Sequence, residues 1–314
     1  MSQTVLITGA NGFLGRVLTV LLRTRGFDVV TTDKTFGADL VGDLSHESFV
    51  QTLPDVDVLV NCAAVQYVSK DLPLLLRENY FLKNNIVTAE NLFNKYKASK
   101  THFIHIGTSM LYKQTGQALY TVSDTKTGEG VYSKSKALAQ EILNNLPNLA
   151  TVIPCIIAGK GREGLFVPMV KSIKRFKCAI FPGRGEHKVH MVHVEDVATL
   201  VLSIIEKKAT GYFNAAGSDP ISISEWANNV GEVMGYSAVF RIRIPLLPLA
   251  WISKLLGYRV LAKEQLLMLK HPHVLDISES LALGWEPRFN NRLIVRHTAE
   301  HILNKSSADA VDVT

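Results

Sequence analysis

The feature that most constrains this fold is the glycine-rich stretch at residues 8–15, Thr-Gly-Ala-Asn-Gly-Phe-Leu-Gly. An apolar run at residues 4–7 precedes it and predicts a buried strand, while residues 16–22 carry apolar side chains at helical spacing. The three glycines allow a tight turn, let backbone N–H groups approach a pyrophosphate, and let the helix pack closely on the strand. The N-terminus of that helix then faces the phosphates with its partial positive charge. The stretch therefore predicts a dinucleotide-binding turn formed by Gly9, Asn11, Gly12, Phe13, Leu14 and Gly15.

An acidic residue follows at the end of the second predicted strand, residues 28–32, where the chain has Asp33. In a dinucleotide-binding fold a carboxylate at this position accepts hydrogen bonds from the ribose hydroxyls of adenosine and repels a 2′-phosphate. The neighbouring Lys34 could weaken the discrimination against NADP. We nevertheless expect NAD, rather than NADP, as the cofactor.

The bulk composition is that of a globular protein. The chain has 314 residues, 47% of them hydrophobic and 20% charged, which is enough for one large domain or two smaller ones. A formal charge of +6 suits anionic ligands such as nucleotides, but no concentrated basic stripe indicates nucleic acid binding. Three scattered cysteines, Cys62, Cys155 and Cys178, predict buried thiols in a reducing compartment. With neither a signal peptide pattern nor an apolar run of the roughly 20 residues that span a bilayer, we expect a cytoplasmic protein with no transmembrane segment.

Strand and helix patterns alternate through the first half of the chain, which is typical of a parallel sheet with helices on both faces. Further strands are predicted within residues 38–44, 56–64, 101–106 and 150–154, and helices at 74–96 and 131–143. We therefore predict an α/β fold, a Rossmann-type doubly wound parallel sheet with a smaller, discontinuous α/β substrate domain. The predicted NAD-binding domain comprises residues 1–156 and 190–214, and the substrate-binding domain comprises 157–189 and 215–304.

The second half of the chain is less regular. Residues 195–202 predict an amphipathic helix, and Ser222 with Glu225 three residues later predicts a capping box at the start of another. The segment 244–257 is very apolar and allows two interpretations, a packed helix of the second domain or a lid over an apolar or membrane-held substrate. Residues 305–314 are predicted to be a disordered tail.

A candidate catalytic pair, Tyr132 and Lys136, lies on the predicted helix at 131–143. Residues four apart share one helical face, so both side chains can meet around one substrate. A phenol titrates near pH 10, but a neighbouring ammonium and a positively charged nicotinamide would both favour the phenolate. Tyr132 could then take a proton from a substrate hydroxyl while hydride leaves the same carbon for NAD. A third member is expected after the strand at 101–106, where the hydroxyl of Thr108 or Ser109 could orient the reacting oxygen.

Several motifs spread from Val5 to about Ile302 carry a family resemblance. The turn at residues 8–15 matches T-G-x-x-G-x-x-G, residues 42–44 match G-D-L, and residues 85–89 correspond to N-V-x-G-T. Tyr132 and Lys136 match Y-x-x-x-K, residues 194–198 match V-x-D-V-A, and residues 283–287 match L-G-W-x-P. By these motifs the chain resembles extended short-chain dehydrogenases/reductases of the NAD-dependent epimerase/dehydratase family.

The resemblance implies roles for further residues. It implies Thr108 as the active-site hydroxyl, and it places the Lys136 ammonium on the nicotinamide ribose as well as beside Tyr132. It also implies a homodimer formed through the helices at 74–96 and 131–143. The additional residues that it places around the cofactor are Asp43, Leu44, Ala63, Ala64, Asn85 and Pro154.

Departures from the family pattern concern the substrate. The family's R-P-x-x-x-Y-G-P segment lacks its Arg and Tyr here, and the Arg that often holds a diphosphate corresponds to Val189. Arg184 and Lys188 are nearby cations that could substitute, and with Ser109 they are the candidate substrate residues. The leading prediction is an epimerase or ketoreductase acting on a nucleotide sugar. The alternatives are a 3β-hydroxysteroid- or lipid-type dehydrogenase and a non-catalytic NAD-sensing protein.

Three histidines, His187, His190 and His193, lie close together in the sequence. The segment alternates as a strand, which turns His190 to the face opposite the other two. We therefore expect no metal site.

Overall fold

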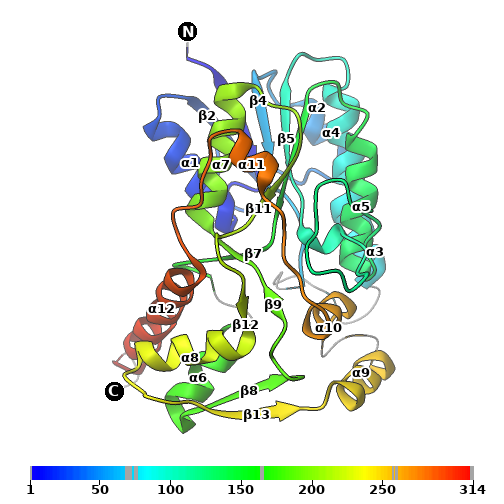
Figure 1. Ribbon diagram of the computed structural model, residues 1–314. Helices are drawn as coiled ribbons and strands as arrows, with labels where there is room; N and C mark the ends of the chain where they lie inside the picture. Colours follow the sequence, from blue (N-terminus) through cyan, green and yellow to red (C-terminus); the bar gives the residue numbers. More distant parts are fainter. Residues whose placement is uncertain are drawn as a thin grey trace.

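A computed structural model describes residues 2–67, 73, 77–162, 166–256, 258 and 261–311, with side chains through residue 304. Its centre is a seven-stranded parallel sheet in the order β11-β6-β5-β4-β1-β2-β3 (Figure 1). The strands are β1 (Thr4–Thr8), β2 (Asp28–Asp33), β3 (Leu40–Val41), β4 (Val58–Asn61), β5 (His102–Ile106), β6 (Leu149–Pro154) and β11 (Gly211–Ala215). The order changes direction at β1, which pairs with β2 on one side and with β4 on the other. Ligands of such sheets bind beyond the carboxyl ends of the strands at this switch point.

Helices cover both faces of the sheet, as the alternating pattern predicts (Figure 1). The helices are α1 (Phe13–Thr24), α2 (Glu47–Gln51), α3 (Arg77–Phe81), α4 (Thr88–Tyr96), α5 (Val131–Leu143) and α7 (Val194–Lys207). Successive side chains of a strand point to opposite faces. Accordingly Val5 and Ile7 of β1 join the core under α1 and α7, whereas Leu6 joins the core under α4 and α5.

The predicted helix at 74–96 is divided in the structure. Residues 74–76 lie outside the described part, and α3 is followed by a π-helical turn, Leu82–Val87, before α4 begins. The turn contains Asn85, which is buried and hydrogen-bonds the backbone of Val65. Such turns occur frequently at functional sites.

A second lobe lies below the sheet in Figure 1 and has its own hydrophobic cluster, which includes Val170, Phe181, Trp226 and Ile294. Its helices are α6 (Phe166–Phe176), α8 (Ile223–Val233), α9 (Leu246–Leu255), α10 (Lys263–Lys270) and α12 (Asn291–Val311). Its strands form two-stranded sheets and are β7 (Ile156–Ala158), β8 (Cys178–Pro182), β9 (Lys188–Val189), β12 (Ile221–Ser222) and β13 (Phe240–Ile244). The partner of β7 is β10 (Met191–His193), which leads directly into α7. The predicted capping box of Ser222 is confirmed at the start of α8.

One sequence-based expectation for this lobe needs correction. The apolar segment 244–257 is not a packed helix, because Ser253 is the one buried residue of α9. Helix α12 extends through Val311, and the disordered tail at 305–314 stays a prediction. Residues 312–314 lie outside the described part of the chain. Among the described residues, no helix combines the length and the hydrophobicity needed to cross a bilayer.

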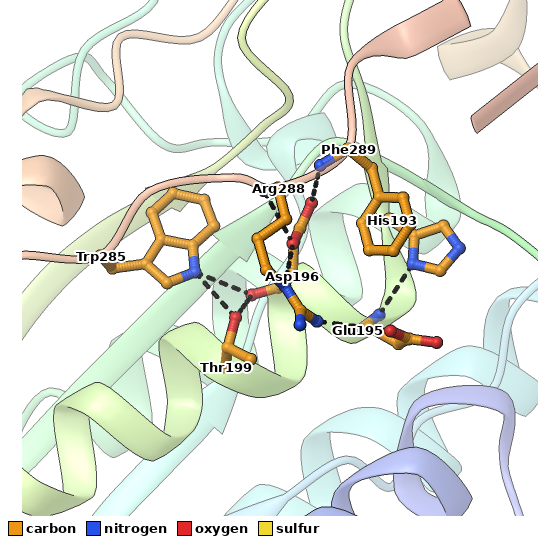
Figure 2. Close-up of polar contacts among 7 residues, drawn as sticks. All are labelled: His193, Glu195, Asp196, Thr199, Trp285, Arg288 and Phe289. Atoms are coloured by element: carbon orange, nitrogen blue, oxygen red, sulfur yellow. Dashed lines mark hydrogen bonds and ion pairs between the residues drawn. The ribbon is translucent and has the colours of Figure 1, made fainter. Parts of the chain in front are cut away.

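Two of the sequence motifs meet where the lobes join (Figure 2). The carboxylate of Asp196, in the first turn of α7, is fully buried and accepts the backbone N–H groups of Arg288 at 3.0 Å and Phe289 at 3.1 Å. The indole N–H of Trp285 donates to the Asp196 carbonyl at 3.0 Å and to the Thr199 hydroxyl at 3.1 Å. These contacts fix the segment that leads into α12 against the sheet domain.

Candidate active site

The glycine turn has the geometry that the sequence predicts. Gly9 adopts φ +65°, and a Cβ there would lie 2.8 Å from the backbone of Ala63. A Cβ on Gly15 would overlap the carbonyl oxygen of Gly9. A side chain at Gly9 would therefore push the turn away from the end of β4. A side chain at Gly15 would push α1 away from the turn.

The first turn of α1 fits a pyrophosphate. Gly12 is the N-cap, no side chain caps the helix, and its first turn contains no acidic residue. The N-terminus follows β1 directly and therefore lies at the switch point between β1 and β4. The backbone of Phe13 and Leu14 opens this helix, so their N–H groups are placed to donate to phosphate oxygens.

Asp33 ends β2 beside this turn and organises it. One carboxylate oxygen accepts the N–H of Asn11 at 3.0 Å, and the other accepts the N–H and the hydroxyl of Thr35 at 3.0 and 2.8 Å. The oxygen that accepts from Asn11 has a further lone pair that a ribose hydroxyl can use. Asp33 thus holds the loop in place and keeps acceptor capacity toward a ligand.

The residues assigned to the cofactor by family resemblance surround the same edge of the sheet. Asp43 accepts the N–H of Ser45 at 2.8 Å; burial raises its pKa, but this bond and others lower the pKa on balance. Asn85 joins the segment after β4 to the catalytic helix, because its amide also donates to the Ser135 hydroxyl at 2.9 Å. Leu44, Ala63, Ala64 and Pro154 follow or end strands β3, β4 and β6.

The three predicted catalytic side chains gather at the carboxyl end of β5. Tyr132 and Lys136 stand on the first turns of α5 and are buried, with exposures of 6% and 2%. The Thr108 side chain lies close enough to the Tyr132 phenol to lower its pKa. The Lys136 amine donates to the carbonyl of Ile106 at 2.9 Å and lies 3.1 Å from Nε2 of His105.

The electrostatics of the phenol differ from the sequence-based expectation. Burial raises the pKa of Tyr132 to about 12, while the nearby Thr108 side chain and the Arg162 guanidinium act in the opposite direction. Lys136 is not among the groups that shift this pKa, because its amine faces β5, and burial lowers the pKa of Lys136 to about 8. The expectation that the Lys136 ammonium favours a phenolate is therefore wrong for the protein without its cofactor.

The sequence did not predict two charged residues that lie at the site. Arg162 lies 5.6 Å above the ring of Phe13 and interacts with the Tyr132 phenol, which places a cation between the glycine turn and the catalytic helix. Glu264 of α10 is buried and accepts the N–H and the hydroxyl of Ser133, both at 2.9 Å. Arg162 follows the strands that end at this edge and could have been suspected on that ground. Glu264 contacts a residue 131 positions away and carries no local signal.

A buried hydrogen-bonded chain connects the glycine turn to the catalytic lysine. Thr8 donates to the side-chain oxygen of Asn61 at 2.7 Å, and the Asn61 amide nitrogen lies 3.2 Å from Nδ1 of His105. His105 in turn meets Lys136. An ammonium only donates, so Nε2 of His105 accepts a hydrogen bond when Lys136 is charged, and the direction of the chain depends on the protonation of Lys136.

The candidate substrate residues are more dispersed. Ser109 is buried and its hydroxyl lies 2.7 Å from the imidazole of His273, so it does not line an open site. Lys188 forms an ion pair with Glu225 at 2.5 Å. Arg184 lines a cavity of about 380 Å³ in the second lobe, together with His187, Arg243, Ile244, Pro245, Leu246, Leu269 and Lys270.

The other two histidines of the cluster have structural contacts. Nδ1 of His190 accepts the N–H of Leu275 at 3.1 Å, and Nδ1 of His193 caps α7 by accepting the N–H of Glu195 at 3.4 Å. Burial lowers the pKa of each ring to about 4, so both are neutral acceptors near pH 7.

Comparison with known proteins identifies the family of this chain. The model of the NAD dependent epimerase/dehydratase family matches residues 5–216. A dTDP-4-dehydro-6-deoxy-D-allose reductase from a Streptomyces species is 26% identical over 81% of this chain and 88% of its own length. NADH dehydrogenase [ubiquinone] 1 alpha subcomplex subunit 9 from Dictyostelium discoideum is 22% identical over 76% of this chain, which spans 66% of that protein.

Solved structures share the fold at low sequence identity. UDP-glucuronic acid 4-epimerase from Bacillus cereus in complex with NAD has a TM-score of 0.75 at 18% identity, with 96% of this chain and 99% of that chain covered. dTDP-4-dehydrorhamnose reductase from Bacillus anthracis in complex with NADP has a TM-score of 0.74 at 17% identity, with 97% and 100% covered. Proteins of this fold thus hold either nicotinamide cofactor.

Proposed function

We propose that this chain, which belongs to the NAD-dependent epimerase/dehydratase family, transfers hydride between NAD and a carbinol or ketone carbon of a nucleotide sugar, as an epimerase or ketoreductase. The observation that carries the proposal is the pairing of Thr108 with the phenol of Tyr132 on the catalytic helix, at the sheet edge where the glycine turn opens.

The chemistry follows from what these side chains can hold. Bound NAD would supply the hydride acceptor. The Tyr132 phenolate takes the proton of the substrate hydroxyl as the C–H bond gives up its hydride, which leaves a ketone and a neutral phenol. Thr108 positions the reacting oxygen, and the reverse steps return the proton to an alcohol. Arg162 and the positive charge of bound NAD both favour the phenolate that burial opposes.

The preference for NAD over NADP rests on Asp33. Its carboxylate adjoins the turn through Asn11 and retains acceptor capacity for one ribose hydroxyl. A 2′-phosphate at the same place would meet like charge.

The cationic cavity in the second lobe supports a nucleotide diphosphate as the recognised part of the substrate. Arg184, Arg243 and Lys270 line it, although Arg243 also forms an ion pair with Glu186 at 3.6 Å, and apolar side chains complete the wall. Guanidinium groups bind diphosphate oxygens in a bidentate fashion. Lys188 is paired with Glu225, and the Ser109 hydroxyl is within hydrogen-bond distance of His273. Both are therefore weaker candidates for substrate binding than the sequence alone indicates.

Substitution at Tyr132 tests this proposal. Tyr132→Phe should keep NAD binding and lose at least about 10²-fold in turnover of the true substrate, because it removes the proton acceptor and little volume. Native mass spectrometry measures the bound cofactor, and NADH absorbance with a panel of nucleotide sugars measures turnover. Turnover near the wild-type rate in this variant contradicts the assigned chemistry.

A 3β-hydroxysteroid- or lipid-type dehydrogenase is the second candidate, and the exposed apolar helix α9 is the observation that favours it. NADH formation with sterols but with no nucleotide sugar would select it. The complete set of Thr108, Tyr132 and Lys136 argues against a non-catalytic NAD sensor.

We further propose the domain division at residues 156/157, 189/190 and 214/215, a homodimer through α3, α4 and α5, and a cytoplasmic location. Leu82, Val131 and Leu138 stand 36–45% exposed on the proposed dimer helices, which suits an apolar contact. Sedimentation velocity at micromolar concentration tests the dimer, and a purely monomeric species counts against it.

A further inference from the structure

One end of the second lobe exposes an unusual amount of apolar side chain. Strands β8 and β13 and helix α9 lie together at the bottom of Figure 1, away from the seven-stranded sheet. We call the surface formed by β8, β13 and α9, with the last turn of α6, the basal surface.

The paired strands contribute one apolar face. Side chains two apart on a strand share a face, so Phe240, Ile242 and Ile244 line up along β13. They are exposed by 72%, 45% and 38%, and Ile180, the register partner of Ile242 on β8, is exposed by 44%. The four side chains thus form a continuous apolar strip.

Helix α9 follows β13 in the chain and exposes an apolar stripe of its own. Leu247, Trp251 and Leu255 are spaced by four residues, which places them on one helical stripe. Their exposures are 78%, 76% and 87%. Large apolar side chains at this exposure, next to one another, mark an interaction surface more often than an ordinary monomer surface.

The charge of the basal surface is mostly positive. Residues 174–184 and 240–256, which form it, contain no Asp or Glu, and the neighbouring Glu186 forms an ion pair with Arg243 at 3.6 Å. Their cations are Lys174, Arg175, Lys177, Arg184, Arg241, Arg243 and Lys254. Chain-wide, 34 Lys and Arg stand against 28 Asp and Glu, so this local imbalance far exceeds the average.

We propose that the basal surface docks on an anionic phospholipid bilayer. Apolar side chains with a tryptophan among them enter the interface between headgroups and acyl chains, while surrounding cations attract anionic headgroups. A second copy of this chain would bring seven more cations against the same surface, which disfavours a symmetric contact here. The proposal concerns where the protein works and does not depend on the reaction proposed above.

Trp251 provides a direct probe. The other two tryptophans, Trp226 and Trp285, are buried, with exposures of 4% and 3%. Vesicles of phosphatidylcholine mixed with phosphatidylglycerol should shift the tryptophan emission of the full chain to the blue and carry the protein into the pellet. Vesicles of phosphatidylcholine alone should do neither at physiological salt.

Charged substitutions distinguish docking through the basal surface from nonspecific adsorption to vesicles. The triple variant Leu247→Glu, Trp251→Glu, Leu255→Glu should bind the mixed vesicles at least roughly tenfold more weakly. Lys254→Glu should weaken binding about fivefold or more. Val20→Glu, at a side chain 67% exposed on α1, is the matched control and should bind as the wild type does. Unchanged melting temperatures would verify that each variant is folded.

Three results would overturn the proposal. One is the absence of binding to the mixed vesicles by the wild-type chain. Another is undiminished binding by the triple variant. The third is a dimer in sedimentation velocity that the triple variant dissociates, because the basal surface would then be occupied by a second copy.

Discussion

Replacing His105 should weaken the protein in a manner that reports on the charge of Lys136. The buried ammonium has two described acceptors, the Ile106 carbonyl at 2.9 Å and Nε2 of His105 at 3.1 Å. His105→Phe removes one of them. A hydrogen bond to a charged group contributes about 1.5–3 kcal/mol, and a neutral one about 0.5–1.5 kcal/mol. The difference of about 1–1.5 kcal/mol should lower the pKa of Lys136 by about one pH unit in the variant.

The free energy that the variant loses at neutral pH has an upper limit, because Lys136 can release its proton. With a pKa of about 8, Lys136 at pH 7 can lose its proton at a cost of about 1.4 kcal/mol, and the variant cannot lose more charge-related free energy than this. The loss of unfolding free energy caused by His105→Phe should thus be about 1 kcal/mol greater at pH 7 than at pH 9.5, where the amine is neutral in both proteins. Urea denaturation at the two pH values measures this difference.

The pKa of Lys136 in the wild-type protein determines whether its contribution to the unfolding free energy rises or falls with pH. Lys136 binds fewer protons folded than unfolded between its folded pKa of about 8 and its ordinary value of 10.5. Its contribution to the unfolding free energy therefore rises with pH through that window, by about 3 kcal/mol in all.

His102→Phe is the matched control. His102 is on the same strand and is also buried, but its Nε2 lies 2.9 Å from the Ala209 carbonyl oxygen. Its loss should cost similar amounts at pH 7 and 9.5. Equal losses at both pH values for His105→Phe would refute the coupling to Lys136.

Three further outcomes are expected. Asp33→Ala should narrow the difference in affinity between NAD and NADP, and titration showing NADP at least tenfold tighter in the wild type, about 1.4 kcal/mol, would contradict the role of Asp33. Asp196→Ala should lower the unfolding free energy by about 2–4 kcal/mol in urea, because two buried backbone N–H groups lose a charged acceptor; Glu195→Ala, at an exposed ion pair, should cost under about 1 kcal/mol. UDP- and dTDP-hexoses with NAD should yield no 4-keto-6-deoxy product, because Ser109 and Met110 after Thr108 cannot serve as acid and base; a product lighter by one water would overturn this.

The sequence by itself determined the parts of this protein that are local. The strand, the glycine turn and the helix at residues 4–24 are encoded by backbone requirements within one stretch, and the structure has them where the periodicity places them. The catalytic helix begins and ends at the predicted residues, Val131 and Leu143, since its apolar spacing is regular. Thr108 could be placed at the same edge as Tyr132 because parallel strands bring their carboxyl ends together.

Tertiary structure decided whatever depends on burial and on distant partners. The phenol was expected to ionise readily, but depth in the protein raises its pKa, and the lysine four residues away faces β5 instead. Glu264, which caps the catalytic helix, comes from α10, far along the chain, so no local sequence pattern predicts its contact. Apolar composition predicted a helix near residues 246–255 but not which way it faces. The exposure of a side chain depends on how the whole molecule packs around it. The local sequence indicates only that apolar side chains tend to be buried.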